Sequence, residues 1–160
     1  MTKPSRVLST REAETWADAA RHPGKRVVFT NGVFDLVHPG HVRYLRDARA
    51  LGDVLIVGLN SDRSVRANKG SGRPVNTERE RAEVLAALAV VDAVVIFDEG
   101  TPYEIIRRIQ PDVLVKGADW GPDRIVGRDI VEAGGGRVVR LALAPGFSTT
   151  QLIERIRQTG

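Results

Sequence analysis

The chain has 160 residues and a mass of 17.5 kDa, which predicts one domain that buries roughly 70% of the surface of its unfolded chain. It is 42% hydrophobic and 28% charged, a balance that excludes a disordered or collagen-like chain. The net charge is +4, the 24 basic residues are spread along the sequence, and only 5% of residues are aromatic. This pattern disfavours a nucleic-acid groove built on stacking aromatics, whereas the sign of the charge suits a phosphorylated small molecule.

The sequence also indicates where the protein is located and which cysteine-based chemistry it lacks. No apolar run approaches the roughly 20 residues of a membrane helix, and the start MTKPSRVLST lacks the apolar core of a signal peptide. We therefore expect a cytoplasmic protein with no membrane contact. The absence of cysteine excludes disulfides, cysteine nucleophiles, iron–sulfur clusters and thiolate zinc sites.

Helix caps mark several of the expected helices. Ser9 and Glu12 have the spacing of a capping box, so we expect a helix ending near Ala20 within an N-terminal helical extension over residues 1–25. The polar, glycine-rich stretch 60–76 is expected to be a long loop. Further helices are predicted over residues 40–50, 77–89, 101–109, 124–133 and 149–157.

Apolar runs alternate with these helices and predict the strands. The five expected strands are Val27–Asn31, Val54–Leu59, Ala93–Phe97, Val113–Lys116 and Arg137–Leu143. Strands that alternate with helices form a parallel sheet with helices on both faces. The expected fold class is therefore α/β, a single doubly wound Rossmann-like domain over residues 1–160 with a five-stranded parallel sheet. In such folds the ligand lies beyond the carboxyl ends of the strands, where the strand order reverses.

The loop after the first of these strands carries the strongest functional signal. It reads TNGVFDLVHPGH and holds two of the three histidines, His38 and His41, three positions apart at the start of a helix. Both imidazoles can face one site there, and Gly40 lets a ligand approach the backbone closely. The amides and the positive dipole end of the following helix attract anions. The loop therefore suits a polyphosphate.

The segment HPGH (residues 38–41) resembles the HxGH signature of the cytidylyltransferase-like nucleotidyltransferase superfamily, and the resemblance extends from about Arg26 to Arg157. The runs PDVLVKGADW (111–120) and GFSTTQLIERI (146–156) are most similar to the adenylyltransferase domain of ADP-heptose synthase. That domain occurs fused to a sugar kinase or as a separate chain, and this chain resembles the stand-alone form. The resemblance implies transfer of AMP from ATP to a heptose 1-phosphate with release of pyrophosphate, and it implies a homodimer.

The resemblance also implies roles for the residues at matching positions. His38 and His41 would stabilise charge on the α-phosphate during in-line attack by the acceptor phosphate, and Lys69 would reach the phosphates from a mobile loop. The implied nucleotide-binding residues are Thr30, Asn31, Gly32, Phe34, Gly40, Lys116, Gly117, Ser148, Thr149 and Thr150. The implied substrate-binding residues are Asp35, Arg73, Arg81, Asp119 and Trp120.

Simpler interpretations compete at several of these positions. Ser148 can be a plain helix N-cap. Lys69 and Arg73 can be solvated loop charges, and Arg81 can form a salt bridge on a helix surface. Lys116 differs from these, because a lysine at the end of a buried strand is costly unless it meets an anion.

No metal site is assigned to the protein itself, because Asp98, Glu99 and Asp112 are loop carboxylates without ligand spacing. Mg²⁺ is expected to arrive with the nucleotide and to bridge its phosphate oxygens. Asp35 is expected to orient the loop or a histidine.

The sequence departs from the superfamily pattern at one residue and in one segment, and other functions therefore stay open. Ile153 stands where many members carry an arginine or lysine, and the segment 143–149 lacks the arginine of the RTEGIST motif of glycerol-phosphate cytidylyltransferases. One alternative within the same chemistry is a cytidylyltransferase, which transfers CMP from CTP to glycerol 3-phosphate or another polyol phosphate. The other is transfer of a different nucleotide to a sugar phosphate. A catalytically silent nucleotide-binding regulator is disfavoured by the two intact histidines, and a nucleic-acid binder by the scattered charges.

Overall fold

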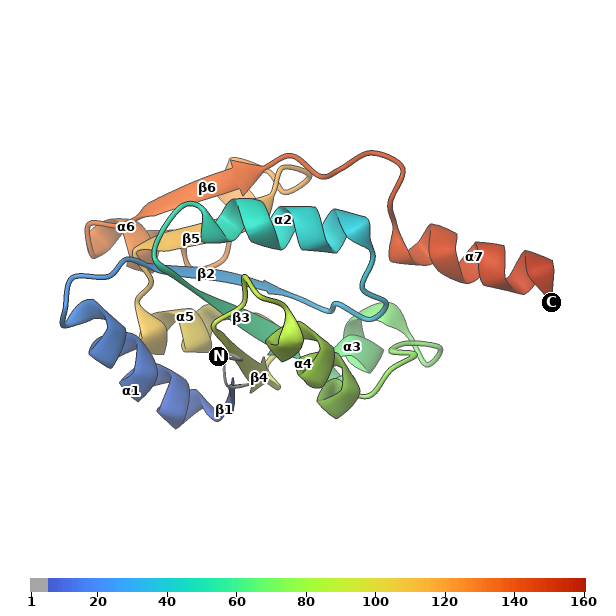
Figure 1. The fold of residues 1–160 in the computed structure, drawn as a ribbon, viewed down its shortest axis with the longest axis horizontal. Coiled ribbons are helices and arrows are strands. Elements are labelled where there is room, and N and C mark those ends of the chain that lie inside the picture. Colours follow the sequence, from blue (N-terminus) through green and yellow to red (C-terminus); the bar gives the residue numbers. More distant parts are fainter. Residues whose placement is uncertain (1–5) are drawn as a thin grey trace.

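The computed structural model describes residues 6–160 of the chain. Its strands are β1 (Val7–Leu8), β2 (Val27–Gly32), β3 (Val54–Asn60), β4 (Ala93–Phe97), β5 (Val113–Gly117) and β6 (Arg137–Leu141). They form one parallel sheet in the order β1-β4-β3-β2-β5-β6 (Figure 1). The α/β Rossmann-like class is confirmed. The prediction of five strands is wrong, because β1 adds a sixth strand beside β4.

The helices are α1 (Thr10–Arg21), α2 (Pro39–Arg49), α3 (Asp62–Lys69), α4 (Glu78–Ala87), α5 (Tyr103–Ile109), α6 (Arg128–Ala133) and α7 (Thr149–Thr159), with a 3-10 turn η1 (Pro122–Arg124). Both predicted capping boxes are present, at the starts of α1 and α4. The prediction of one long loop over residues 60–76 is wrong, because α3 occupies its first half. Ser61 caps α3 by accepting a hydrogen bond from the Ser64 amide at 3.2 Å. The helix predicted over residues 124–133 is divided between η1 and α6.

The N-terminal extension contributes more than a helix. It holds β1 as well as α1, and α1 buries Ala13 and Ala17 completely within the core. The first five residues of the predicted extension lie outside the described part of the chain.

Helices cover both faces of the sheet and create two apolar cores. On one face α1, α5 and α6 pack against the strands, with Ile106 and Val131 among the buried side chains. On the other face α2 and α4 cover the sheet and bury Leu45 and Leu85. A fully buried side chain of this kind contributes roughly 1.5–3 kcal/mol. Helix α7 differs, because it has no buried residue and extends away from the rest of the structure (Figure 1).

The strand order reverses at β2, in the centre of the sheet. The chain proceeds from β2 to β3 and β4 on one side, then returns to place β5 and β6 on the other side. Strand β2 pairs with β3 as far as Gly32, whereas its pairing with β5 ends at Phe29 opposite Leu114. The two strands therefore separate toward their carboxyl ends, which is where doubly wound folds bind ligands.

No helix within residues 6–160 combines the length and the apolar character that crossing a bilayer requires.

Candidate active site

A pocket of about 390 Å³ lies at the carboxyl ends of β2 and β5, within the size range of small-molecule sites. All but two of the predicted site residues line it. These are Asn31, Gly32, Phe34, Asp35, His38, Gly40, His41, Lys69, Arg73, Lys116, Gly117, Asp119, Trp120, Ser148, Thr149 and Thr150. The structure thus brings together segments that are more than 100 residues apart in the sequence.

The two histidines form a stacked pair at the start of α2. Their ring centroids lie 3.8 Å apart with an interplanar angle of 22°. The Nδ1 atom of His41 accepts a hydrogen bond from the backbone amide of His38 at 3.3 Å. A neutral imidazole whose Nδ1 is an acceptor carries its proton on Nε2, so His41 offers Nε2–H as a hydrogen-bond donor.

Burial controls the charge of this pair. It lowers the pKa of His41 to about 4, with a further contribution from the neighbouring His38, and it also lowers the pKa of His38. Both rings are therefore mainly neutral near pH 7 in the free protein. They present neutral donors and acceptors to a ligand rather than a fixed double charge.

Gly40 allows the turn between the histidines to close. A Cβ atom at this position would lie 2.9 Å from Cε1 of His38 and 3.0 Å from Cβ of Phe147. Any larger residue would therefore displace the His38 ring or the segment before α7. The glycine of the HPGH segment is required for this packing.

Two buried polar atoms in the pocket wall have no hydrogen-bond partner within the described protein. They are Oδ1 of Asn31 and Nδ1 of His38. A buried polar atom without a partner is costly, so nearly all such atoms in folded proteins are paired. Both atoms line the same pocket and are therefore available to a molecule bound there.

Lys116 reaches the pocket from the end of β5. Its residue is only 8% exposed, and its Nζ atom lies 5.0 Å from the ring centroid of Trp120. Burial lowers the pKa of Lys116 to about 8, while the Asp119 carboxylate opposes that shift. An anion in the pocket would raise this pKa again by favouring the charged form, which agrees with the interpretation of Lys116 as an anion-binding group.

The pocket also receives a second helix N-terminus. Ser148 caps α7 by accepting a hydrogen bond from the Gln151 amide at 3.2 Å, and it lines the pocket together with Thr149 and Thr150. Ser148 is thus both a plain N-cap and a pocket residue. Two helix N-termini, of α2 and α7, direct their positive dipole ends toward one site, an arrangement suited to phosphates.

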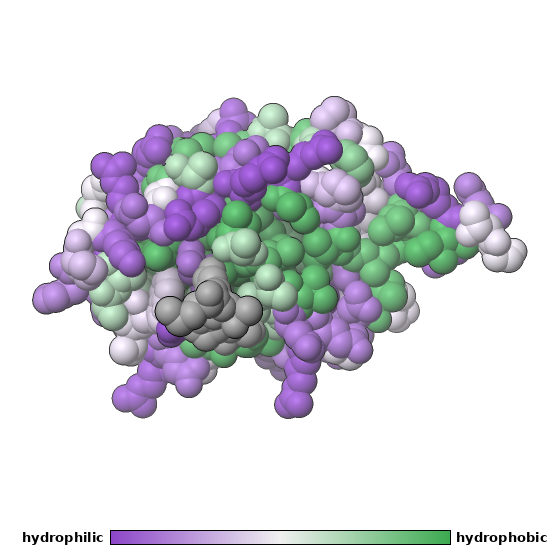
Figure 2. Space-filling view, in the orientation of Figure 1, coloured by the Kyte–Doolittle hydropathy of each residue, from purple (hydrophilic) through white to green (hydrophobic). Residues whose placement is uncertain are grey.

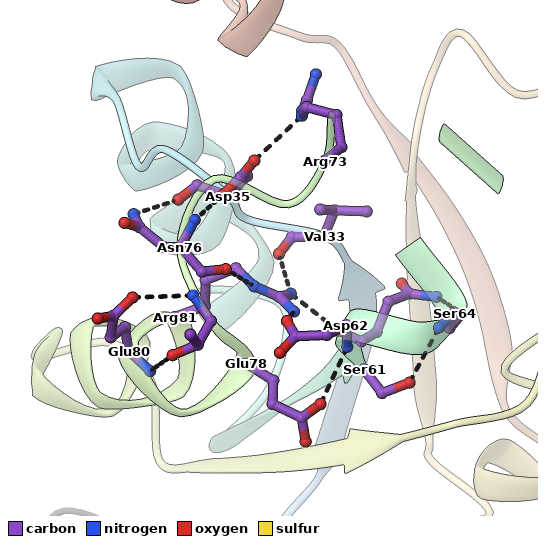
Figure 3. A network of polar contacts seen from close by, with 12 residues as sticks. Val33, Asp35, Ser61, Asp62, Ser64, Arg73, Asn76, Glu78, Glu80 and Arg81 are labelled. Atoms are coloured by element: carbon purple, nitrogen blue, oxygen red, sulfur yellow. Dashed lines mark hydrogen bonds and ion pairs between the residues drawn. The ribbon is translucent and has the colours of Figure 1, made fainter. Parts of the chain in front are cut away.

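Asp35 holds a neighbouring loop in place. Its buried carboxylate accepts hydrogen bonds from the amides of Val75 and Asn76 and from Nε of Arg73, the last at 3.1 Å (Figure 3). This carboxylate therefore fixes the segment that follows α3. Lys69, at the end of α3, reaches the pocket from the same region.

Arg81 is buried beneath the pocket rather than exposed in its wall. It is 1% exposed and donates hydrogen bonds to the carbonyls of Val33, Asn60 and Asn76 and to the Asp62 carboxylate, at 2.8–3.1 Å (Figure 3). The predicted substrate-binding role is therefore not supported. The alternative of a salt bridge on the helix surface is wrong, because the Arg81 side chain is fully buried in its ion pair with the partly exposed Asp62. Arg81 connects β3, α3 and the two loops above them.

Thr30 is the second predicted site residue that does not line the pocket. It is fully buried, and its hydroxyl lies 2.8 Å from the Tyr44 hydroxyl and donates to the Val115 carbonyl at 3.0 Å. This bond joins β2 to β5 just beyond the end of their backbone pairing. Thr30 therefore supports the floor of the site and makes no contact with its interior.

Five lining residues were missed by the sequence analysis, namely Val33, Tyr44, Leu143, Ala144 and Phe147. A signal existed for Tyr44, which lies three positions after His41 on the same face of α2. Phe147 directly precedes the Ser148 cap, and only its contacts with α2 reveal its place at the site.

Among residues 6–160 no group of three histidine or acidic side chains is arranged to hold a metal ion.

Comparison with known proteins adds to this geometry. The model of a family described as cytidylyltransferase-like matches residues 29–155. The chain belongs to this family. The matched range contains every residue that lines the pocket, from Asn31 to Thr150, whereas β1 and α1 precede it.

Curated relatives are similar over most of this chain. The chain is 57% identical over 139 residues to "Bifunctional protein HldE" of Syntrophotalea carbinolica, which covers 87% of the chain and 28% of the relative. It is 58% identical over 139 residues to the protein of the same name from Geotalea uraniireducens, with the same coverage. The chain thus spans about 28% of the length of these curated relatives.

A solved structure resembles most of the fold. It is the lipopolysaccharide core biosynthesis protein from Thermoplasma volcanium, with a TM-score of 0.65 and 30% sequence identity. The match covers 76% of this chain and 99% of that protein.

Proposed function

We propose that this chain transfers AMP from ATP to a heptose 1-phosphate, giving ADP-heptose and pyrophosphate. The observation that carries this proposal is the stacked pair of His38 and His41 at the N-terminus of α2, in one pocket with Lys116 and the N-terminus of α7. Membership of the cytidylyltransferase-like family supports nucleotidyl transfer. Similarity to the HldE proteins and to a lipopolysaccharide core biosynthesis protein supports a sugar acceptor of the heptose type. The transferase domain is proposed to extend over residues 1–160, with 1–25 as its N-terminal extension.

In the proposed reaction an oxygen of the acceptor phosphate attacks the α-phosphorus of ATP in line. The bond between the α-phosphorus and the oxygen bridging to the β-phosphate breaks, and pyrophosphate leaves with that electron pair. The acceptor phosphate is already anionic, so the protein need not remove a proton from it. The work of the protein is to position both substrates and to stabilise charge on the α-phosphate.

Several pocket residues have a proposed role in this reaction. His41 donates Nε2–H to an α-phosphate oxygen, and His38 lies against it. The amides of the α7 N-terminus and Lys116 bind the nucleotide, and Lys69 neutralises the departing phosphates. Arg73, Asp119 and Trp120 are proposed to contact the acceptor from their places in the pocket wall, while Asp35 acts by holding Arg73.

We propose that Mg²⁺ enters bound to ATP, as part of the substrate. The donor set fits this arrangement, because the Asp35 carboxylate is occupied by three backbone or side-chain donors and Asn31 offers a single oxygen without a partner. Mg²⁺ bound mainly by substrate phosphates and water needs few protein ligands.

The remaining proposals concern assembly and location. We propose a cytoplasmic homodimer that binds no nucleic acid. Support for a dimer comes from an apolar patch near α2 and α4 on the face shown in Figure 2. Val42 on α2 and Val84 on α4 are also exposed, by 38% and 47%.

One substrate screen tests the proposed reaction. ATP, CTP, GTP and UTP would each be combined with Mg²⁺ and a panel of sugar and polyol phosphates, and pyrophosphate release would be measured. We expect turnover with ATP and a heptose 1-phosphate. Turnover only with CTP and glycerol 3-phosphate would instead support the cytidylyltransferase alternative, and nucleotide binding without turnover would support a silent regulator.

A further inference from the structure

Phe147 lies immediately before Ser148, the N-cap of α7, and its ring stacks on that of His38. Its ring centroid lies 6.1 Å from that of His38, and the two rings are nearly parallel, with an interplanar angle of 16°. The guanidinium carbon of Arg43, on α2, lies 5.2 Å from the centroid of the Phe147 ring. The ring therefore connects the segment before α7 with α2.

The backbone around Phe147 makes this contact specific. Gly146, before it, has a φ of +85°, and Ser148, after it, caps α7. The ring thus lies between a left-handed turn and a helix N-terminus, and its Cβ would lie 3.0 Å from a Cβ added at Gly40, so that one of the two would have to shift. Movement of the α7 N-terminus would move Phe147, and with it the side chain stacked on it.

The His38 ring needs such a constraint. The second side-chain torsion of a histidine has a broad range of allowed angles, so only contacts with neighbouring groups can fix the orientation of the ring. His41 is fixed by the hydrogen bond from the His38 amide, whereas Nδ1 of His38 has no partner within the described protein. The faces of the His38 ring are therefore oriented by stacking, on His41 and on Phe147.

We propose that Phe147 is a positioning residue for the transfer reaction: it orients the His38 imidazole and couples it to the phosphate-binding N-terminus of α7. This inference rests on the proposed function for its kinetic consequences, although the contact itself can be tested without any reaction. Phe147 touches no reacting atom and acts through His38.

A double-mutant cycle tests the route of action. Phe147→Ala should lower kcat by about 5- to 10-fold with a change in the KM for ATP of no more than about 2-fold, a scale expected for losing one ring contact. In a His38→Ala background the same change should alter kcat by less than about 2-fold, because the ring it positions is gone. Phe147→Tyr should restore kcat, and Ile156→Ala, which truncates an exposed apolar side chain of α7, should leave it unchanged.

Two results would overturn the proposal. One is an equal loss of kcat in both backgrounds, and the other is a rise in the KM for ATP with kcat unchanged. NMR spectra of the unliganded protein give an independent readout, because the ring current of Phe147 should shift the His38 ring protons in the wild type and in Phe147→Tyr but not in Phe147→Ala. Identical His38 signals in all three would also overturn it. A wild-type chain that is inactive with every substrate would contradict the proposed function, while the NMR comparison would still decide whether Phe147 orients His38.

Discussion

His41 owes its proposed role to one backbone hydrogen bond. The His38 amide occupies Nδ1, so the remaining ring nitrogen carries the proton and faces a ligand as a donor. We predict that His41→Ala lowers kcat by about 10²-fold or more, the scale of losing one transition-state donor. Pyrophosphate release under saturating substrates measures this, with His22→Ala, at the exposed end of α1, as the matched control. An unchanged kcat for His41→Ala would remove this residue from the mechanism.

The depressed pKa of His41 also predicts how stability depends on pH. The folded-state pKa is about 4, against an ordinary value of 6.5 in the unfolded chain. Between these values the unfolded chain binds more protons, so the free energy of unfolding falls as the pH falls from about 6.5 to about 4. His41→Gln should make this fall shallower in urea unfolding experiments. A remaining slope is expected, because the pKa of His38 is lowered too. An identical pH profile for the wild type and His41→Gln would contradict the account.

Lys116 predicts a second pH effect, on binding. Because burial lowers the pKa of Lys116 to about 8, its charge is lost as the pH rises through that value, and the KM for ATP should rise with it. Lys116→Met should raise that KM by about 10-fold or more at neutral pH and abolish the rise at alkaline pH. The control is Lys25→Met, which changes an exposed lysine before β2. It should leave the KM for ATP at neutral pH and its rise at alkaline pH unchanged. A Lys116→Met enzyme with the wild-type KM would show that this lysine does not bind the nucleotide.

At the scale of elements, Arg81 connects the parts that support the pocket. Its guanidinium satisfies three carbonyls and the Asp62 carboxylate inside the protein. We predict that Arg81→Met lowers the free energy of unfolding by about 2–4 kcal/mol, because it leaves three carbonyls and the partly buried Asp62 carboxylate without a donor. Arg79→Met, at an exposed position of the same helix, should change it by less than about 0.5 kcal/mol. Equal urea midpoints for the two variants would contradict the structural role of Arg81.

The elements found from sequence are those with local signals. The capping boxes at Ser9 and Thr77 fix the starts of α1 and α4, since both bonds of each box lie within four residues. Strand β1 has only Val7 and Leu8, too short to show a period, and is defined by pairing with β4. Helix α3 reads DRSVRANK, whose polar composition resembles a loop. Its Ser61 cap was the available signal.

The candidate site likewise combines features with a local sequence signal and features defined only by contacts between distant segments. Its position follows from the fold rule for doubly wound sheets and from the HPGH segment, both readable in the sequence. Thr30 and Arg81 could not be placed from sequence, because their partners, Val115 and Asp62, are defined only by the packing of distant segments. Phe147 was missed for the same reason, since its contact with His38 joins segments over 100 residues apart.

The proposed dimer is tested at the scale of the whole molecule. If the apolar side chains on the face of α2 and α4 form a dimer contact, sedimentation equilibrium should give twice the 17.5 kDa of one chain. Val84→Glu should convert the dimer to a monomer, because it places a charge within an apolar contact. Lys25→Glu, a charge change elsewhere on the surface, should leave the dimer intact. A wild-type protein that sediments as a monomer would contradict this proposal.

The central claim concerns where the α-phosphate of the nucleotide binds. A crystal structure with Mg²⁺ and a non-hydrolysable ATP analogue tests it most directly. We predict that the α-phosphate lies within hydrogen-bond distance of the imidazoles of both His38 and His41, with the outer phosphates near Lys69 and the N-terminus of α7. An α-phosphate bound away from both imidazoles would contradict the account.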